Sequence, residues 1–340
     1  MGAPLAIDLF CGCGGLTLGL RQAGFKVVGA VDSDTLSVET YRRNHRRVTV
    51  WEEDIRKLAV SKVKRQLKLR KGQLDLLAGC PPCQGFSTVR TLNGGRRVQD
   101  ERNDLVFEFL RFVEGLLPKT VMLENVPGLA ADKRMEIFQK RLQKLGYTSD
   151  YRILDAADYG IPQRRRRVML LGGRFGPVEF ALGKPERRTV RDAISALPPV
   201  AESDDPLHDL TAKRSKRIID LIKSVPKNGG SRTDLDEGRQ LACHRRCDGF
   251  KDVYGRMAWD KVAPTITSGC INPSKGRFLH PEEDRAITLR EAALLQGFPP
   301  NYHISLRRGK YPAAALIGNA LPPGFVKEQA KSVEQYLKSR

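Results

Sequence analysis

Residues 5–15 read Leu5-Ala6-Ile7-Asp8-Leu9-Phe10-Cys11-Gly12-Cys13-Gly14-Gly15, and this stretch decides the fold. Its apolar part, residues 5–10, is typical of a buried strand, and the glycines after it predict a tight turn. Helical patterning follows over 16–23, and a second apolar run over 27–32 predicts another strand. A strand, a glycine turn, a helix and a strand in this order indicate an α/β fold.

The same alternation continues along the first half of the chain. Short apolar runs predict further strands over 48–51, 75–79, 120–124 and 168–172. Helical patterns cover 34–43, 104–117, 288–296 and a last stretch that begins at Pro322-Pro323. Ser33 is a candidate N-cap for the second helix, and Thr288 with Glu291 forms a capping-box pattern. We therefore expect a mostly parallel sheet flanked by helices.

The sequence changes character at about residue 175. From there to about 285 it carries many charges, turn signals such as Asn228-Gly229-Gly230, and little periodicity. We expect a large domain over 1–174, a smaller loop-rich domain over 175–285, and a hinge with a C-terminal helix over 286–340.

The charge of the chain indicates a polyanionic partner. Its 340 residues contain 59 Lys and Arg against 39 Asp and Glu, which leaves a net charge of +20. Such a surplus favours nucleic acid as the partner, and a merely basic protein is the alternative. Residues 56–71 hold eight basic residues and no acidic one, a pattern found more often on a solvated helix face than on a binding stripe.

Other features narrow the class of protein. No run approaches the roughly 18 apolar residues of a membrane helix, and the N-terminus lacks the pattern of a secretory signal. We expect a cytoplasmic protein, nucleoid-associated in a prokaryote, with no membrane partner. The seven cysteines are an odd number, so free thiols are the expectation.

The glycine cluster is a candidate ligand loop. Glycines between a strand and a helix let a ligand approach the backbone and the helix N-terminus. Asp32 comes 20 residues after Gly12, at the end of the second strand, and could bind ribose hydroxyls. Nicotinamide cofactors, flavins and S-adenosylmethionine all suit this pattern, although the glycine spacing is tighter than in a dinucleotide fingerprint.

A second cluster, Cys80-Pro81-Pro82-Cys83-Gln84, follows the fourth predicted strand. Its Cys-x-x-Cys spacing allows a thiol redox pair, and Cys243 and Cys247 could complete a four-cysteine metal site. Cys83 alone could be a nucleophile, and a buried structural thiol is the plainest alternative.

A third cluster, Glu124-Asn125-Val126-Pro127, follows the fifth predicted strand. It lies on the same expected sheet edge as Gly12 and Cys83, and ligands bind at that edge in α/β folds. A carboxyl group, a thiol and a cofactor loop on one edge predict an active site.

Taken in order, these segments resemble the DNA cytosine-5 methyltransferase family. The cofactor loop is similar to residues 8–15, the nucleophile loop to Pro82-Cys83-Gln84, and the acid motif to Glu124-Asn125-Val126. Three further motifs resemble residues 163–167, 290–299 and 318–323. Six motifs in the right order make chance agreement negligible. The resemblance implies a Rossmann-like, mostly parallel methyltransferase sheet with a smaller, loop-rich target-recognition domain over 175–285.

The resemblance also implies roles for single residues. The expected catalytic residues are Cys83, Glu124, Arg165 and Arg167. The expected cofactor is S-adenosylmethionine, with S-adenosylhomocysteine as its product and no metal. The expected cofactor-binding residues are Asp8, Phe10, Gly12, Gly14, Gly15, Asp32, Asp54, Ile55, Pro82, Leu105, Asn319 and Leu321. The expected nucleic-acid contacts are Gln84, Ser87, Arg232, Arg239, Arg245 and Arg246.

The expected reaction is methyl transfer to C5 of a cytosine that has flipped out of duplex DNA in a specific sequence. We expect a monomer, and a cognate restriction or defence component is a further candidate partner. The alternatives are a transfer-RNA cytosine-5 methyltransferase of the same fold, a catalytically silent nucleic-acid-binding relative, and a nicotinamide dehydrogenase. The glycine spacing and the combination of Cys83 with Glu124 weaken the last of these.

Overall fold

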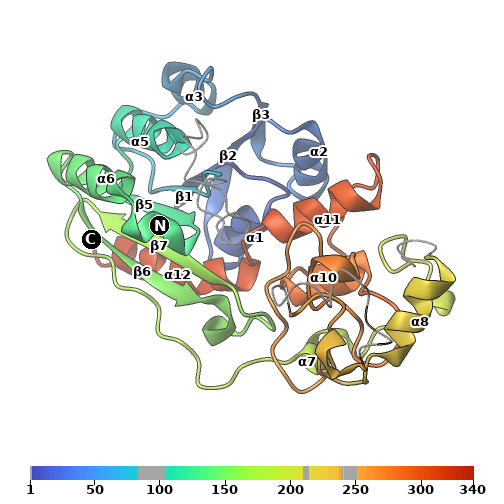
Figure 1. Ribbon diagram of the computed structural model, residues 1–340. Coiled ribbons are helices and arrows are strands. Elements are labelled where there is room, and N and C mark those ends of the chain that lie inside the picture. Colours follow the sequence, from blue (N-terminus) through green and yellow to red (C-terminus); the bar gives the residue numbers. More distant parts are fainter. Residues whose placement is uncertain (1, 83–103, 210–213, 237, 239, 241–250) are drawn as a thin grey trace. The chain divides into compact units, whose positions relative to one another are not determined.

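The computed structural model describes residues 2–82, 104–209, 214–236, 238, 240 and 251–340 (Figure 1). The chain divides into two compact units. The first unit contains residues 1–159, 166–183 and 321–340, and the second contains residues 160–165 and 184–320. The functional domain boundaries given above stay a prediction. In the part of the chain described, no helix is long and apolar enough to cross a membrane.

A seven-stranded sheet forms the centre of the first unit. Its strands are β1 (Leu5–Leu9), β2 (Lys26–Asp32), β3 (Thr49–Glu52), β4 (Leu76–Gly79), β5 (Thr120–Asn125), β6 (Thr148–Asp155) and β7 (Arg166–Gly173). They lie in the order β3-β2-β1-β4-β5-β7-β6, and β7 runs in the direction opposite to the other six strands. The prediction of a mostly parallel sheet is confirmed.

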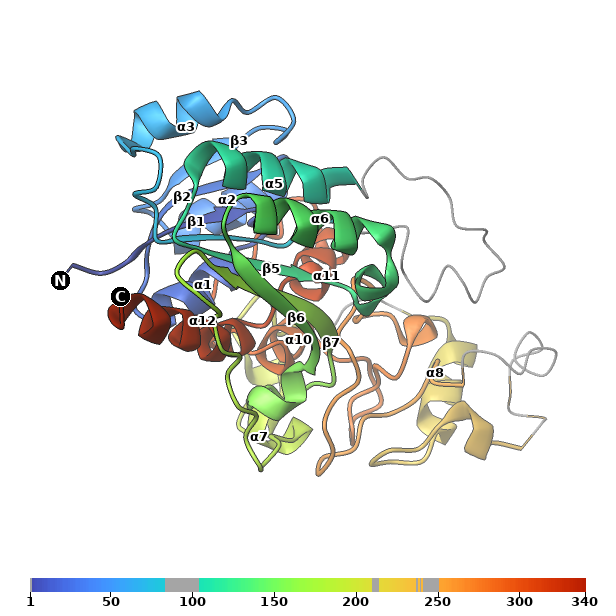
Figure 2. The same ribbon diagram turned by 90° about the vertical axis from the view of Figure 1, so that its left-hand side faces the viewer.

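Helices cover both faces of this sheet. One layer consists of α3 (Val60–Leu67), α5 (Leu105–Leu116) and α6 (Lys133–Lys144), with α5 packed between the other two. Figure 2 shows this layer above the sheet, with α1 (Gly15–Gln22) and α12 (Pro323–Lys338) below it. The helix α2 (Thr35–Asn44) joins β2 to β3. Short 3-10 helices follow β5 and β6 at Pro127–Ala131 and Ala156–Tyr159.

The N-terminal helix α1 depends on the far end of the chain. Gly19 faces α12, and a Cβ atom at this position would lie 2.5 Å from Pro323 O and from Val326 Cβ. Only a residue without a side chain permits this close approach, so the sequence of α1 is matched to α12. The predicted start of the last helix at Pro322-Pro323 is confirmed, since Pro322 is the N-cap of α12.

Helix starts were predicted with mixed success. Thr288 caps α10 (Leu289–Leu295), and Glu291 completes the capping box, as the sequence predicts. The N-cap of α2 was predicted wrongly by one position. Asp34, not Ser33, accepts the backbone N–H of Ser37, because the helix begins at Thr35, one residue later than the sequence pattern predicts.

The second unit contains short helices and irregular segments. Its α-helices in the described part are α7 (Val190–Ile194), α8 (Lys216–Ser224), α10 and α11 (Lys310–Asn319). Single-turn 3-10 helices lie at Val200–Glu202, Arg232–Asp234 and Pro273–Lys275.

One arginine holds these irregular segments together. The side chain of Arg256 is fully buried, and its guanidinium donates five hydrogen bonds. The acceptors are the carbonyl oxygens of Val225, Ile222, His280 and Glu283 at 2.6–3.0 Å and the carboxylate of Asp284 at 2.6 Å. All five N–H groups of the guanidinium therefore have acceptors, which offsets the cost of burying its charge.

Replacing Arg256 by methionine is expected to lower the free energy of unfolding by about 2–6 kcal/mol, because the buried carbonyl groups of Val225 and His280 lose their only donor among the described residues, at about 1–3 kcal/mol each. The other three acceptors each keep a second donor. Urea denaturation followed by circular dichroism measures this loss. The matched control is Arg217→Met on the exposed surface of α8, for which we expect almost no change. Equal stability of the two variants would contradict the role given to Arg256.

Candidate active site

The predicted site residues of the first unit follow strands whose carboxyl ends are neighbours. Leu9 of β1 pairs with Gly79 of β4, and Gly79 pairs with Leu123 of β5. The glycine loop follows β1, the Cys80-Pro81-Pro82 segment follows β4, and Glu124 lies near the end of β5. The parallel topology thus brings the three clusters to one sheet edge, as the sequence predicts.

At this edge Glu124 forms an ion pair with Arg167. Nε of Arg167 lies 2.9 Å from Oε1 of Glu124, and both side chains are largely buried. The pair exists because β7 runs antiparallel beside β5, which places the start of β7 next to the end of β5. A fixed carboxylate beside a guanidinium can hold a planar polar ligand in one orientation.

The next residue, Asn125, joins β5 to the segment after β4. Its Nδ2 donates to the carbonyl oxygen of Pro81 at 2.9 Å, and its Oδ1 accepts the backbone N–H of Val126. This link holds the Cys80-Pro81-Pro82 segment beside Glu124. Cys83, the next residue in the sequence, lies outside the described residues. Asn125 was quoted in the sequence motif without a role, and the structure gives it one.

The glycine loop has an unusual backbone. Phe10 has φ of 63°, a left-handed conformation that is rare for an aromatic residue, and Gly12 and Gly14 have φ of 51° and 97°. Gly14 is the N-cap of α1, and Gly15 begins the helix. Strained backbone of this kind persists where the surrounding structure fixes it, and it gathers at ligand sites.

Asp32 fixes this loop. Its Oδ2 accepts the backbone N–H of Gly12 at 2.9 Å, and its Oδ1 accepts that of Asp34 at 2.9 Å. Burial raises the pKa of Asp32 above its ordinary value, and these backbone hydrogen bonds oppose the rise. The carboxylate therefore acts inside the protein as well as being available to a ligand.

Below the loop lies a buried polar cluster. Asp8 Oδ2 accepts a hydrogen bond from Thr17 Oγ1 at 2.7 Å, and Thr17 Oγ1 lies 2.7 Å from Tyr41 Oη. Asp8 Oδ1 is buried and has no hydrogen-bond partner among the described residues. Burial raises the pKa of Asp8 to about 8. The hydrogen bond from Thr17 opposes this rise, and the nearby Asp32 carboxylate adds to it, both by less than burial does.

His45 supports the same loop from the side. Its Nε2 lies 3.3 Å from Gly14 O, and its Nδ1 lies 3.3 Å from Arg21 Nη1. Burial lowers the pKa of His45 to about 4, so the ring is neutral at ordinary pH. Sequence reasoning missed Thr17, Tyr41 and His45, because a single hydroxyl or imidazole between apolar residues gives no recognisable pattern.

The other predicted cofactor residues lie at several positions. Asp54 follows β3 and binds Arg56, whose hydrogen bond lowers the pKa of Asp54. Ile55 is buried, Pro82 is exposed, and Leu105 begins α5. Asn319 ends α11 in the second unit, and Leu321 is a buried residue of the first unit.

In the second unit, Gln163 is the centre of a buried amide network. Its Nε2 donates to Gln296 Oε1 at 2.5 Å, and its Oε1 accepts the backbone N–H of Ile266 at 2.8 Å. Gln296 in turn donates to the carbonyl oxygen of Ala320. Arg165 is buried as well, and its Nη1 donates to Ile266 O at 3.1 Å. Three of the quoted motifs therefore meet through hydrogen bonds.

Few of the predicted nucleic-acid contacts are described. Gln84, Ser87, Arg239, Arg245 and Arg246 lie outside the described residues. Arg232 is 4% exposed, and its contact with nucleic acid stays a prediction. Gly230 packs against the backbone of Pro226, so its lack of a side chain serves packing within the unit.

Only some of the cysteines in the redox and metal-site alternatives lie in the described part of the chain. Cys11, Cys13, Cys80 and Cys270 form no disulfide among the described residues. The remaining members of the proposed redox pair and metal site, Cys83, Cys243 and Cys247, lie outside the described residues.

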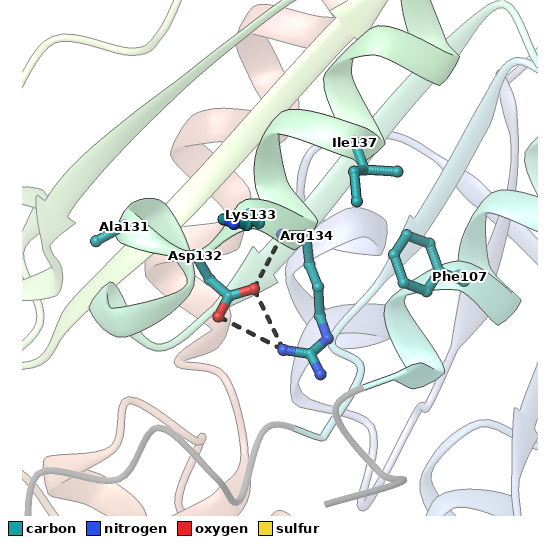
Figure 3. Close-up of a pocket in the computed structure, with 6 residues that line it drawn as sticks. All are labelled: Phe107, Ala131, Asp132, Lys133, Arg134 and Ile137. Carbon is teal, nitrogen blue, oxygen red and sulfur yellow. Dashed lines mark hydrogen bonds and ion pairs between the residues drawn. The ribbon is translucent and has the colours of Figure 1, made fainter. Parts of the chain in front are cut away.

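A cavity of about 500 Å³ lies at the N-terminal ends of α5 and α6, lined by Phe107, Ala131, Asp132, Lys133, Arg134 and Ile137 (Figure 3). Arg134 donates to the carboxylate of Asp132 at 3.3 Å and pairs with Asp104 at 3.1 Å. The charged groups are thus partly satisfied by one another, and none of the predicted site residues lines this cavity.

Comparisons with known proteins agree on one protein family. Residues 5–335 match the model of a family described as C-5 cytosine-specific DNA methylase. The chain is 37% identical to the Type II methylase M.HgiDII of Herpetosiphon aurantiacus, over 97% of this chain and 95% of that protein. It is 32% identical to the Type II methyltransferase M.XorII of Xanthomonas oryzae pv. oryzae, over 100% of this chain and 87% of that protein.

Solved structures agree with these relatives. One is described as a putative DNA modification methyltransferase encoded within an E. coli prophage. Its match has a TM-score of 0.76 and 25% sequence identity, and it covers 99% of this chain and 100% of that protein. Another is the S. pombe Dnmt2 methyltransferase. Its match has a TM-score of 0.61 and 20% sequence identity, and it covers 98% of this chain and 99% of that protein. The second likeness shows the fold alone.

Proposed function

Since the chain belongs to the C-5 cytosine-specific DNA methylase family and is a DNA cytosine-5 methyltransferase, we propose which of its residues carry the reaction. Cys83 is the nucleophile, Glu124 is the acid that assists it, and Arg165 and Arg167 hold the base. The observation that carries this proposal is the Glu124–Arg167 pair, which Asn125 joins to the segment leading into Cys83.

The chemistry explains why these groups are needed. Cytosine C5 is a weak nucleophile, and addition of the Cys83 thiolate at C6 turns the ring into an enamine-like species that reacts at C5. When bound, S-adenosylmethionine supplies the electrophilic methyl group. Loss of the C5 proton then expels the thiolate and restores the aromatic ring. The target carbon is inaccessible inside a duplex, so the cytosine leaves the base stack.

Glu124 acts at N3 of the flipped base. A proton or hydrogen bond supplied there withdraws electron density from C6 and favours thiolate addition. The ion pair with Arg167 fixes one carboxylate oxygen and so orients the other toward a ligand at the sheet edge.

The residues around the glycine loop fit S-adenosylmethionine. A Cβ atom at Gly12 would meet no described atom within 4 Å, so there is open space at the backbone of the loop. Asp8 Oδ1 is an acceptor without a partner in the described residues, suited to a hydrogen-bond donor of a ligand. No described side chain caps the N-terminus of α1. We propose that Asp8, Phe10, Gly12 and Gly14 hold the methionine part, and that Asp32 holds the ribose.

Asp32→Ala is expected to weaken S-adenosylmethionine binding at least about tenfold, because each hydrogen bond to a charged group contributes about 1.5–3 kcal/mol. Isothermal titration calorimetry measures this. We also propose that Asp54 binds the adenine amino group. The comparison variant Asp54→Ala removes this contact without touching the glycine loop, so it should weaken binding less. Unchanged affinity of Asp32→Ala would place the ribose elsewhere.

Sequence recognition is proposed for residues 175–285. The catalytic motifs bind a flipped cytosine, which carries no information about its neighbours, so the duplex must be read by other residues. Direct contacts from arginine to guanine contribute about 1–3 kcal/mol of discrimination each. The relatives above are named Type II methylases, and a cognate restriction component is therefore proposed as a partner.

Replacing this segment with that of a relative that methylates another sequence is expected to move the methylated sequence. Bisulfite sequencing of a methylated random duplex library measures the target before and after the exchange. An active chimera that keeps the original target would place recognition in the catalytic domain. Parallel assays with labelled S-adenosylmethionine and either duplex DNA or transfer RNA test the choice of nucleic acid.

A further inference from the structure

Much of the basic charge of the chain lies in one segment whose Lys and Arg residues have no part in the proposed reaction. Residues 42–71 contain twelve Lys and Arg against three Asp and Glu, so these 30 residues hold +9 of the net charge of +20. The three carboxylates are already paired, Glu52 with Arg42, Glu53 with Lys62 and Asp54 with Arg56. Nine cations therefore remain without a carboxylate partner among the described residues.

The topology of the first unit places many of these cations at the amino edge of the sheet. The links from α2 to β3 and from α3 to β4 both lie at the amino ends of their strands, opposite to the edge that carries the glycine loop and Glu124. The first link contains Arg46 and Arg47, and the second contains Arg70 and Lys71. All four side chains are exposed, as is Lys26 at the start of β2.

Helix stabilisation does not account for these four residues. Cations in the last turn of a helix interact favourably with its dipole, and Arg42, Arg43, Lys64 and Arg65 occupy such positions. Arg46 and Arg47 lie beyond the end of α2 at Asn44, and Arg70 and Lys71 lie beyond the end of α3 at Leu67. The carboxylate at the start of β4, Asp75, is paired with Lys119. Exposed like charges without carboxylate partners repel one another, which favours a polyanion as their partner.

The spacing of the two pairs suits a nucleic-acid backbone. Strands β3 and β4 are separated by β2 and β1, so the two links stand about 14 Å apart at a strand spacing of about 4.8 Å. Each strand of duplex DNA carries one phosphate per about 3.4 Å of helix axis, so about 14 Å of axis carries about four phosphates of one strand.

We propose that the amino edge, formed by Lys26, Arg46, Arg47, Arg70 and Lys71, binds the phosphate backbone of a second segment of duplex DNA. The choice of DNA as the polyanion rests on the proposed function. A molecule that binds a remote segment of the same DNA at this edge can search for its target without leaving the polymer. The edge reads no bases, because its cations contact phosphates only.

The experiment uses three variants of the full chain. Two carry Arg46→Gln with Arg47→Gln, or Arg70→Gln with Lys71→Gln, and the third carries all four changes. The matched control is Lys331→Gln with Lys338→Gln, which removes two exposed cations from α12 of the same unit. Unchanged affinity for S-adenosylmethionine shows that each variant has folded.

The first measurement is the salt dependence of binding to a duplex that lacks the target. Each double variant should lower the slope of log K against log salt by about two and the quadruple variant by about four, while the control changes little. The second is kcat/KM for plasmid-length DNA relative to a short duplex carrying the target. We expect this ratio to fall at least fivefold in the quadruple variant, with activity on the short duplex unchanged.

Three results would overturn the proposal. Equal slopes in the control and the double variants would mean that only the net charge matters. An unchanged ratio between long and short DNA would mean that the edge does not contribute to the search. A slope that falls for single-stranded RNA but not for duplex DNA would assign another partner. A wild-type chain that methylates no duplex would instead refute the proposed function. The salt dependence of its binding would still test whether the amino edge binds DNA.

Discussion

Cys83→Ala is expected to abolish methyl transfer while cofactor binding is retained. The thiolate is the only group proposed to add at C6, and a methyl side chain cannot replace it. A duplex that contains 5-fluorocytosine should trap the wild-type chain as a covalent adduct, because fluorine at C5 does not leave as a proton does. Denaturing gel electrophoresis detects the adduct, and the variant should form none.

The control for this experiment is Cys80→Ala. Cys80 forms no disulfide with a described residue, and the proposed reaction gives its side chain no part. This variant should keep its activity. An inactive Cys80 variant would revive the redox pair or the metal site, and an adduct formed by Cys83→Ala would show that another residue attacks the base.

Glu124→Gln is the second change with a large expected effect. Loss of a positioned acid typically lowers the rate by about 10²- to 10⁴-fold. The amide keeps the shape of the side chain but no longer matches the charge of Arg167, which lies 2.9 Å away in the wild type. Single-turnover methylation should slow accordingly, while the affinity for duplex DNA changes much less.

A matched variant separates this effect from a general loss of charge. Glu114→Gln on α5 removes a carboxylate that lies 3.8 Å from Arg141, and its side chain is 45% exposed. We expect wild-type rates from it. A Glu124→Gln rate within a few-fold of wild type would mean that the carboxyl group does not assist at N3.

The parallel part of the fold could be predicted because its strands are buried and continuous. All six residues of β5 are buried, and the runs that predicted β1, β2, β3 and β4 end within two residues of the observed bounds. The edge strand β6 was missed because its residues are partly exposed and mix charged with apolar side chains. The antiparallel direction of β7 could not be predicted from the sequence pattern either, since strand direction depends on partners far along the chain.

The sequence likewise predicted only part of the site. Glu124 and Arg167 could be named from motifs, because their chemistry is carried by residue type and spacing. The supports of the glycine loop could not, since His45 reaches Gly14 O across 31 positions of sequence. Asn125 and Pro81 are likewise 44 positions apart, and only their strands bring them together. Long-range hydrogen bonds of this kind leave no local signature.

The packing of α1 against α12 has a consequence for synthesis on the ribosome. Gly19 and its neighbours emerge early, but their partners Pro323 and Val326 come from the far end of the chain. At about 5–20 residues per second, translation of residues 184–320 alone takes about 7–30 s. Throughout that interval α1 lacks the cover that α12 provides. We expect the nascent chain to need protection from aggregation during this time, and the sheet to complete its packing only when the last helix is released.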